Sequence, residues 1–313
     1  MSSLKGKKIV VTGGAGFLGS RVVEQLIARG ASKESIIVPR SKNYDFRTRE
    51  ACDRVVVEAD IIIHAAAIVG GIGYNRAHPG SAFYDNAAMA LNLIDAAREA
   101  GVKKFVGIGS VCEYPKFVDV PFKEDDLWNG YPEETNAPYG LAKKMMLVQS
   151  QAYAQEYGMD AIHLLMVNLY GPGDNFNPES SHVIPALIKK VYDAKKERIK
   201  WIEAWGTGKA SREFLYVDDA ARAIVLATEQ YEKTDPVNLG SGMEITIKEL
   251  TETICELMDY RGEIRWDPSK PDGQPRRALD VSRAETEFGF KAEVLFREGL
   301  QRMIDWYISN PKN

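Results

Sequence analysis

The sequence predicts an α/β protein built on a doubly wound parallel sheet, with a smaller C-terminal lobe. Three observations support this fold class. Strand-like and helix-like segments alternate from residue 8 to residue 167, a glycine-rich loop follows the first strand-like segment, and the alternation breaks down after residue 168. Alternating strands and helices are typical of a parallel sheet that helices cover on both faces. The 313 residues are enough for one large domain, or for a main domain with a smaller lobe.

The alternation can be followed segment by segment. Short apolar runs rich in β-branched residues predict strands, and longer amphipathic runs predict helices. We expect a sheet of at least six strands. Up to residue 167 the predicted strands are 9–11, 35–38, 61–63, 104–108 and 161–167, and the predicted helices are 21–29, 49–58, 87–100 and 139–157.

Residues 168–187 are rich in Asn, Gly, Pro and Ser, which favour turns. Loops of this kind often carry ligand contacts on a rigid scaffold. Beyond them we expect a strand at 213–217 and helices at 219–229 and 247–258. Because no linker or internal repeat divides the chain, the main domain is predicted to cover 1–172 and about 213–240, and the smaller lobe about 173–212 and 241–313.

The composition excludes several classes of function. Lys plus Arg number 40 and Asp plus Glu number 44, so the formal net charge of −4 argues against a general nucleic-acid binder. The cysteines Cys52, Cys112 and Cys255 form no C-x-x-C pair, so neither a disulfide framework nor a zinc site is predicted. No signal-peptide pattern is present, and no apolar run approaches the ~18 residues of a membrane span. We expect a soluble, cytoplasmic protein with no metal and with neither a nucleic-acid nor a membrane partner.

The glycine loop VVTGGAGFLGS follows the first predicted strand. It places Gly13, Gly16 and Gly19 in G-x-x-G-x-x-G spacing between a strand and a helix. Glycine allows the tight turn and the close approach of the backbone to a pyrophosphate, and the helix N-terminus adds a partial positive charge. The loop therefore predicts a dinucleotide site in a Rossmann domain.

The stretch VPRSKNYD indicates which dinucleotide is bound. An Asp or Glu about 20 residues past the glycine loop is typical of NAD sites. This chain instead has Arg40 and Lys42, and its first carboxylate there is Asp45. Cations suit a 2′-phosphate, so we expect NADP(H). The alternative is that both cations are solvated surface residues.

Tyr139 and Lys143 stand four residues apart at the start of a predicted helix and so share one face. An ammonium near a phenol stabilises the phenolate and lowers the tyrosine pKa, which makes the tyrosine a usable acid or base. By itself, Y-x-x-x-K more often marks a packed tyrosine. Together with the glycine loop and Ser110, which follows the strand at 104–108, it favours catalysis.

This combination resembles the extended short-chain dehydrogenase/reductase family, in which serine, tyrosine and lysine act on a carbonyl or carbinol beside a nicotinamide. Longer stretches are similar to the GDP-L-fucose synthases, from about residue 9 to residue 307. That resemblance implies an NADPH-dependent enzyme, expected to be a homodimer, that converts GDP-4-keto-6-deoxy-D-mannose to GDP-L-fucose by 3,5-epimerisation and 4-keto reduction. The stretches are AAAIVGGIGYN, SVCEYP, NLYGPGDNF, SHVIPALI, WGTGKASREF and SKPDGQPRRALD.

The resemblance also assigns catalytic roles. Epimerisation on both sides of a keto group needs two acid/base groups, which in the resembled family are a cysteine and a histidine; the matching residues are Cys112 and His182. Ser110 and Tyr139 would hydrogen-bond the C4 oxygen, Tyr139 would protonate it, and Lys143 would hold the nicotinamide ribose. Taken alone, a cysteine after a strand is usually a packing residue and a lone histidine is usually a surface residue.

The resemblance to this family also implies which residues bind the substrate and the cofactor. The implied substrate contacts are Lys190, Trp205, Arg212 and Arg277, and Arg276 is a further guanidinium suited to phosphate oxygens. The alternative reading is a core tryptophan and solvated cations. The implied cofactor contacts are Gly13, Gly16, Phe17, Leu18, Gly19, Arg40, Ala65, Ala66, Tyr139, Lys143, Asn168 and His182.

Three departures from the resembled family leave alternatives open. Glu113 follows the cysteine where an apolar residue is usual, Val111 follows the serine where a small residue is common, and the loop GGAGFLG is more similar to that of sugar-nucleotide 4-epimerases. A carboxylate beside Cys112 would disfavour its thiolate. The alternatives are a nucleotide-sugar 4-epimerase that retains NAD, or a reductase of another GDP-deoxysugar. A catalytically silent dinucleotide-binding regulator would need the glycine loop but not the proton-transfer residues.

Overall fold

The computed structural model describes residues 4–270 and 272–310. Within these residues the main sheet has six strands in the order β2-β1-β3-β4-β5-β9, and all neighbouring strands run parallel. This confirms the predicted doubly wound parallel sheet. The strands are β1 (Ile9–Thr12), β2 (Ile36–Ile37), β3 (Ile61–His64), β4 (Lys104–Ser110), β5 (Asp160–Met166) and β9 (Val237–Leu239).

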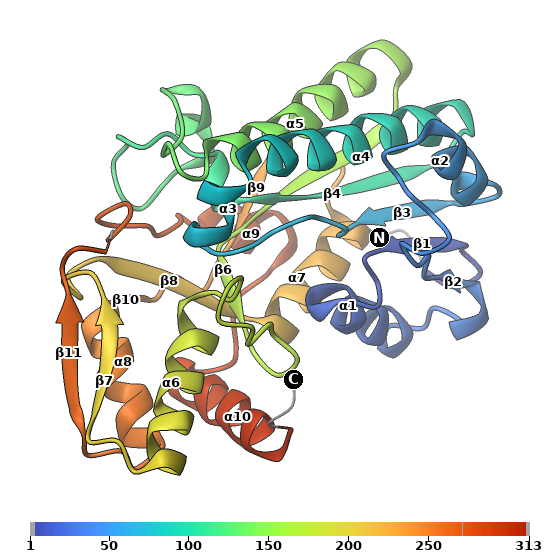
Figure 1. The fold of residues 1–313 in the computed structure, drawn as a ribbon. Coiled ribbons are helices and arrows are strands. Elements are labelled where there is room, and N and C mark those ends of the chain that lie inside the picture. The colour runs from blue at the N-terminus through green and yellow to red at the C-terminus, as the bar shows by residue number, and fades with distance from the viewer. Residues whose placement is uncertain (1–3, 271, 311–313) are drawn as a thin grey trace.

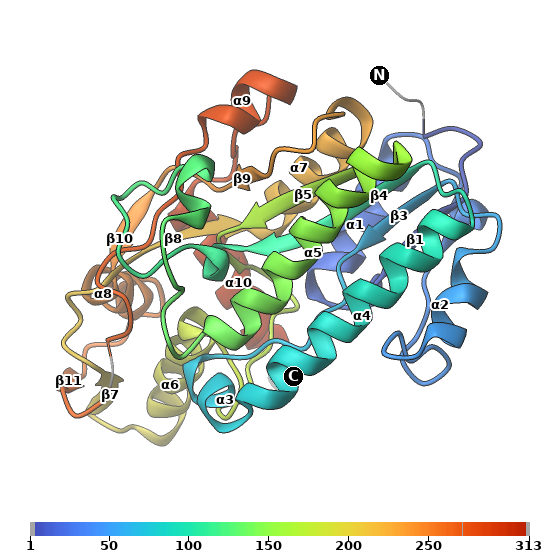
Figure 2. The same cartoon turned by 90° about the horizontal axis from the view of Figure 1, so that it is seen from above.

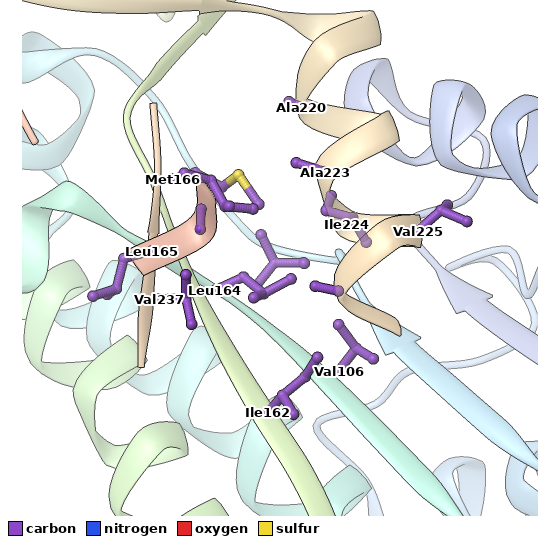
Figure 3. Close-up of a cluster of buried hydrophobic side chains, with 14 of the residues drawn as sticks. Val106, Ile162, Leu164, Leu165, Met166, Ala220, Ala223, Ile224, Val225 and Val237 are labelled. Carbon is purple, nitrogen blue, oxygen red and sulfur yellow. The ribbon is translucent and has the colours of Figure 1, made fainter. Parts of the chain in front are cut away.

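Helices cover both faces of the main sheet. Figures 1 and 2 show α4 and α5 side by side over one face, while α1 and α7 lie against the other. Figure 3 shows the apolar packing between the sheet and α7: side chains of the sheet, including Val106, Leu164 and Val237, lie with Ile224 of α7 in a buried cluster. The helices are α1 (Phe17–Ala28), α2 (Arg49–Val56), α3 (Ile72–Ala77), α4 (Pro79–Glu99), α5 (Ala137–Tyr157), α7 (Val217–Gln230) and α9 (Ser282–Phe288).

Two smaller sheets and three helices form a second region, at the lower left of Figure 1. Ile188, Ile254 and Ile304 belong to its own buried apolar cluster. Its strands are β6 (Asn168–Tyr170), β8 (Ser211–Tyr216) and β10 (Glu244–Thr246) in one sheet and β7 (Trp201–Trp205) and β11 (Glu263–Asp267) in the other; its helices are α6 (Val183–Glu197), α8 (Ile247–Leu257) and α10 (Phe296–Ser309). Short 3-10 helices are η1 (Lys33–Ser35), η2 (Val111–Glu113) and η3 (Glu124–Trp128).

Several boundaries differ from the sequence-based prediction. α1 begins at Phe17 rather than 21, because the glycine loop runs directly into the helix, and α4 begins at Pro79 rather than 87, with proline in its first turn. The segment 168–187, expected as loops, contains β6 and the start of α6. The predicted strand at 213–217 is β8, which lies in a smaller sheet. β9 was not predicted, since a three-residue strand is too short for its periodicity to show.

The strand order places a crevice at the carboxyl ends of β1 and β3. The chain passes from β1 outward to β2 and then returns to β3 on the other side of β1. In open parallel sheets, ligands bind at such a switch point. Gly13 follows β1, Ala65 follows β3, and both line a cavity of about 1310 Å³. No described helix has both the length and the apolar character needed to cross a membrane.

Candidate active site

The loop between β1 and α1 forms one wall of the cavity and leaves no room for larger side chains. Gly13 has a φ of 69°, and a Cβ there would lie 2.8 Å from the Ala66 nitrogen. A Cβ on Gly19 would lie 2.1 Å from the Gly13 oxygen. The start of α1 lines the cavity at Phe17 and Leu18, where the positive end of the helix dipole favours an anion. This wall therefore fits a dinucleotide pyrophosphate.

The segment after β2 presents one of the two predicted cations to the cavity. Arg40 is exposed and lines the cavity, whereas Lys42 is not among the lining residues. Arg47 lines it as well, but its guanidinium donates to Asp45 at 2.8 Å and to Asp85 at 3.1 Å. Arg40 is therefore the cation of the predicted pair that is placed to meet a 2′-phosphate.

The end of β4 carries the serine and the thiol. Ser110 Oγ accepts a hydrogen bond from the Cys112 backbone N–H at 3.2 Å, and the Glu113 carboxylate accepts one from the Ser110 N–H at 2.7 Å. Together these bonds form a capping box around η2. They hold Ser110 and Cys112 against the cavity wall.

The Glu113 carboxylate forms no hydrogen bond with the Cys112 thiol, although the two residues are neighbours in the sequence. It is 0% exposed, and its hydrogen bonds go to the Ser110 N–H and to His163 Nε2, at 3.1 and 3.0 Å, rather than to the thiol. The group that contacts the Cys112 sulfur is Arg277, whose Nη1 donates to Sγ at 3.6 Å.

Tyr139 and Lys143 reach the same cavity from the first turns of α5. Lys143 Nζ lies 6.0 Å from the Tyr139 ring centroid and donates to the Ile108 oxygen at 2.9 Å. Burial lowers the pKa of Lys143 to about 8, with Glu113 acting in the opposite direction.

The pKa of Tyr139 is raised, mainly by burial and further by Cys112 and Glu113, while a hydrogen bond with Ser110 opposes the rise. The sequence-based expectation that the lysine lowers this tyrosine pKa is therefore wrong here, because burial dominates and Lys143 is not among the groups that shift this pKa. Tyr139 is held as a phenol, which can donate a proton.

His182 enters the site from the second region. It is the N-cap residue of α6, and its side chain makes no capping hydrogen bond. The side chain of His182 is exposed to the cavity. The protein around the imidazole nevertheless buries it from bulk water, and this burial disfavours the charged form and lowers the pKa of His182. Cys112 and His182 thus line one cavity from two separate elements.

The far part of the cavity is lined by cations and an aromatic ring. Lys190 Nζ donates to the Glu203 oxygen at 2.9 Å and lies 5.5 Å from the Trp205 ring centroid. The Arg212 guanidinium donates to the Gln274 oxygen at 2.6 Å, and burial lowers its pKa to about 10, with Arg277 adding to the shift.

Neither the Arg212 nor the Arg277 guanidinium forms an ion pair with a carboxylate of residues 4–270 or 272–310, so both charges are available to phosphate oxygens. Arg276, by contrast, is paired with Glu244 at 2.6 Å and does not line the cavity.

The structure brings the predicted catalytic residues and the other predicted binding residues to this one cavity, but Lys42 and Arg276 do not line it. It also adds acidic residues that the sequence analysis did not single out. Asp174 is buried in the wall, and burial raises its pKa to about 7. Asp272 accepts hydrogen bonds from the Thr207 N–H and hydroxyl, both at 2.7 Å. Their positions within the stretches NLYGPGDNF and SKPDGQPRRALD were the signal in the sequence, but neither the burial of Asp174 nor the hydrogen bonds of Asp272 could be read there.

Comparisons with known proteins identify the family of this chain. The model of the family described as "Epimerase: NAD dependent epimerase/dehydratase family" matches residues 9–240. A protein of Oryza sativa subsp. japonica named "Probable GDP-L-fucose synthase 1" is 40% identical over 98% of this chain and 93% of its own length. The protein of Escherichia coli (strain K12) named "GDP-L-fucose synthase" is 36% identical over 97% of each chain.

Solved structures are also similar to nearly the whole chain. A GDP-6-OMe-4-keto-L-xylo-heptose reductase from C. jejuni superimposes with a TM-score of 0.90 at 26% identity, over 99% of each chain. A GDP-L-fucose synthetase from Naegleria fowleri bound to NADP superimposes with a TM-score of 0.85 at 28% identity, over 99% of this chain and 96% of that one.

These matches confirm the resemblance to the GDP-L-fucose synthases and to the extended short-chain dehydrogenases/reductases. The family model spans more than half of the chain, and the relatives align over nearly all of it. The chain therefore belongs to the NAD dependent epimerase/dehydratase family.

Proposed function

We propose that the chain is an NADPH-dependent enzyme that converts GDP-4-keto-6-deoxy-D-mannose to GDP-L-fucose by 3,5-epimerisation and 4-keto reduction. The observation that carries this proposal is one cavity that unites the glycine loop, the Ser110, Tyr139 and Lys143 set, and two separate acid/base groups, Cys112 and His182. Relatives named as GDP-L-fucose synthases support the GDP-sugar as substrate.

The epimerisation uses the thiol and the imidazole. The 4-keto group acidifies the hydrogens on C3 and C5, so a base on one face can remove a proton and an acid on the other face can return one. Cys112, with the Arg277 guanidinium at its sulfur, and His182, whose neutral form burial favours, are suited to these exchanges. Inversion at both carbons needs only these two groups.

The reduction uses the serine and the tyrosine. A bound reduced nicotinamide supplies the hydride to C4. Ser110 hydrogen-bonds the C4 oxygen, and Tyr139, held as a phenol, gives that oxygen its proton. Lys143, one turn further along α5, holds the nicotinamide ribose.

The binding residues divide between the two ends of the cavity. Eight of the proposed cofactor contacts follow β1, β2 and β3, namely Gly13, Gly16, Phe17, Leu18, Gly19, Arg40, Ala65 and Ala66. The other four come from α5 (Tyr139 and Lys143), β6 (Asn168) and the start of α6 (His182), and Arg40 supports NADP(H) over NAD(H). Lys190, Trp205, Arg212 and Arg277 line the other end and suit a base and a diphosphate. We further propose a cytoplasmic homodimer with an NADP-binding domain at 1–172 and about 213–240 and a substrate-binding lobe at about 173–212 and 241–313. Exceptions to these bounds are β6 and β8, which share a sheet with β10, and α9, which packs on β9 and α7. Light scattering of the purified protein tests the dimer.

A second candidate function is a reductase of another GDP-deoxysugar, or a redox-neutral 4-epimerase. The structural similarity to the GDP-heptose reductase favours the first of these. The deciding experiment follows NADPH absorbance with purified protein and freshly made GDP-4-keto-6-deoxy-D-mannose, and identifies the product by NMR. NADPH oxidation that yields GDP-L-fucose supports the proposal. No oxidation, with the cofactor bound, moves the assignment to a redox-neutral epimerase or to another keto sugar.

A further inference from the structure

One buried amide that lines the cavity, that of Gln274, has no role in the mechanism above. Gln274 is 6% exposed and Arg277 is 7% exposed. Gln274 Oε1 accepts hydrogen bonds from Arg277 Nε and Nη2, both at 3.2 Å, and Gln274 Nε2 donates to the Lys116 oxygen at 2.9 Å. The amide therefore connects the Arg277 guanidinium to the segment that follows η2.

The two ends of this amide cannot exchange places. A guanidinium only donates hydrogen bonds and a backbone carbonyl oxygen only accepts them, so Oε1 faces Arg277 and Nε2 faces Lys116. In a flipped amide, N–H groups would point at N–H groups and one oxygen at another. The partners of Gln274 thus assign the orientation of its amide.

The hydrogen bonds to Oε1 fix the plane of the Arg277 guanidinium. Nε and Nη2 lie on one edge of the planar group, so holding both of them also directs Nη1, which donates to Cys112 Sγ at 3.6 Å. The backbone is held as well, because the Arg277 oxygen accepts from the Glu213 N–H at 3.0 Å. The remaining hydrogens on Nη1 and Nη2 have no acceptor among residues 4–270 and 272–310, so a ligand in the cavity can accept from both.

The acceptor that orients Arg277 is neutral. A carboxylate in its place would form a bidentate ion pair with the guanidinium and offset the attraction of Arg277 for an anionic ligand. The Gln274 amide accepts from the same N–H groups and leaves the positive charge uncancelled. Arg212 is held in a comparable way, by the backbone oxygens of Ser211, Asp272 and Gln274 at 2.7, 3.0 and 2.6 Å.

We propose that Gln274 is a positioning residue that holds the Arg277 guanidinium, with its charge uncancelled, for the phosphate that is bonded to the sugar. This role rests on the proposed function, in which a nucleoside diphosphate sugar occupies the cavity. Cys112 acts on the sugar ring in that function, and Arg277 contacts the Cys112 sulfur, so Arg277 is placed at the sugar end of the diphosphate.

The first measurement reads the position of Arg277 and needs no ligand. The Arg277 Nε–H signal is assigned in ¹⁵N NMR spectra by its absence in Arg277→Lys, and its hydrogen exchange with solvent is followed. Gln274→Met keeps the length of the side chain and removes both hydrogen bonds to Oε1. We expect the Nε–H to exchange at least ~10-fold faster in this variant. An unchanged exchange rate in folded Gln274→Met overturns the proposal.

The second measurement reads the phosphate. Isothermal titration calorimetry gives the dissociation constants of GDP and GMP, and their ratio reports the contribution of the terminal phosphate, which corresponds to the sugar-linked phosphate of the substrate. Gln274→Met should weaken GDP binding ~10-fold and GMP binding much less. Equal losses for the two nucleotides would indicate a general disturbance of the cavity and overturn the proposal.

A second variant keeps the proposal testable if Gln274→Met does not fold, and it separates position from charge. Gln274→Glu retains an acceptor for Arg277, so the Nε–H should stay protected from exchange, but the carboxylate offsets the charge. GDP binding should again weaken ~10-fold relative to GMP binding. Wild-type affinity for GDP in Gln274→Glu would overturn the role of the neutral acceptor.

The matched control is Gln151→Met. Gln151 lies in the second half of α5, where its Nε2 donates to the Thr234 oxygen at 3.2 Å. The Arg277 Nε–H exchange and the ratio of the GDP and GMP affinities should keep their wild-type values in this variant. Changes equal to those in Gln274→Met would overturn the assignment to Gln274.

The choice of nucleotide separates this inference from the proposed function. A wild-type protein that binds UDP but not GDP would overturn the proposed GDP-sugar, and UDP and UMP then take the place of GDP and GMP in the same comparison. A loss confined to UDP in Gln274→Met would still support the role of Gln274. A wild-type protein that binds neither nucleoside diphosphate would overturn both proposals.

Discussion

Cys112 differs from the other cysteines of the chain in its surroundings. Cys52 and Cys255 are buried, and burial raises their pKa to about 12 and about 11. Cys112 is partly exposed in the cavity, with the Arg277 guanidinium at its sulfur. The buried thiols therefore stay protonated at neutral pH, whereas Cys112 is placed to exchange a proton with a ligand.

Replacing this thiol tests its role at the scale of one residue. Cys112→Ser should slow the exchange of the sugar C3 and C5 hydrogens with D₂O at least ~100-fold, because a hydroxyl is a much weaker acid than a thiol. Proton NMR of the keto sugar measures the exchange, and NADPH binding should be retained. Cys255→Ala, in α8, should leave the exchange rate unchanged. Normal exchange in Cys112→Ser would remove the thiol from the mechanism.

Arg40 permits a second test at the residue scale. Arg40→Gln should weaken NADPH binding roughly 10- to 100-fold and affect NADH much less, because the lost interaction is a charge-assisted hydrogen bond to the 2′-phosphate. Fluorescence titration of the reduced cofactors measures both affinities. Lys42→Gln is the matched control, since Lys42 does not line the cavity. Equal losses of NADPH and NADH affinity in Arg40→Gln would contradict this assignment.

Among the elements, the β1–α1 turn has a strict steric requirement. A Cβ on Gly19 would lie 2.1 Å from the oxygen and 2.6 Å from the carbonyl carbon of Gly13, and these backbone atoms have little room to move because Gly13 itself abuts Ala65 and Ala66. The loop geometry and the close packing of α1 on the sheet therefore depend on glycine at both positions.

We expect Gly19→Ala to lower the free energy of unfolding by about 1–3 kcal/mol and to weaken NADPH binding. Urea unfolding and cofactor titration measure the two effects. Gly80→Ala, in the first turn of α4, is the control: a Cβ there meets no atom within 4 Å, and alanine is the better helix former, so stability should stay the same or rise. Wild-type behaviour of Gly19→Ala would show that the turn tolerates a side chain.

On the scale of the whole molecule, Asp174 links global stability to pH. Its carboxyl is buried, and burial raises its pKa from 3.8 to about 7. Between these two pH values the folded protein holds a proton that the unfolded chain has released, so this group lowers stability as the pH rises through the window. The cost at neutral pH is at most about 4 kcal/mol, from the size of the shift.

Asp174→Asn should remove this dependence, because an amide does not ionise and its oxygen can still accept the hydrogen bond that Asp174 takes from the Asn175 N–H. Between about pH 5 and about pH 7.5 we expect the variant to lose less stability than the wild type loses. Urea unfolding at both pH values measures it. The same pH dependence in the variant and the wild type would show that the carboxyl is ionised in the folded protein.

The sequence by itself determined the features whose physical cause is local. The G-x-x-G-x-x-G spacing reflects one turn between a strand and a helix, and Tyr139 and Lys143 share a helix face because they are four residues apart. The alternation of strands and helices likewise predicted the parallel sheet, because the hydrophobic periodicity that distinguishes a strand from a helix depends only on neighbouring residues. The resemblance to known enzymes added Cys112 and His182, whose positions alone favoured packing or surface roles.

Only the tertiary structure decided which distant groups meet and how deeply they are buried. His163 and Glu113 are 50 residues apart, and Arg277 and Cys112 are 165 apart, yet each pair is in contact. The spacing of residues in the sequence does not indicate such contacts, because they form only when separate elements pack together. The direction of the Tyr139 pKa shift was missed for the same reason: the neighbouring lysine is visible in the sequence, but the burial that raises this pKa exists only in the folded protein.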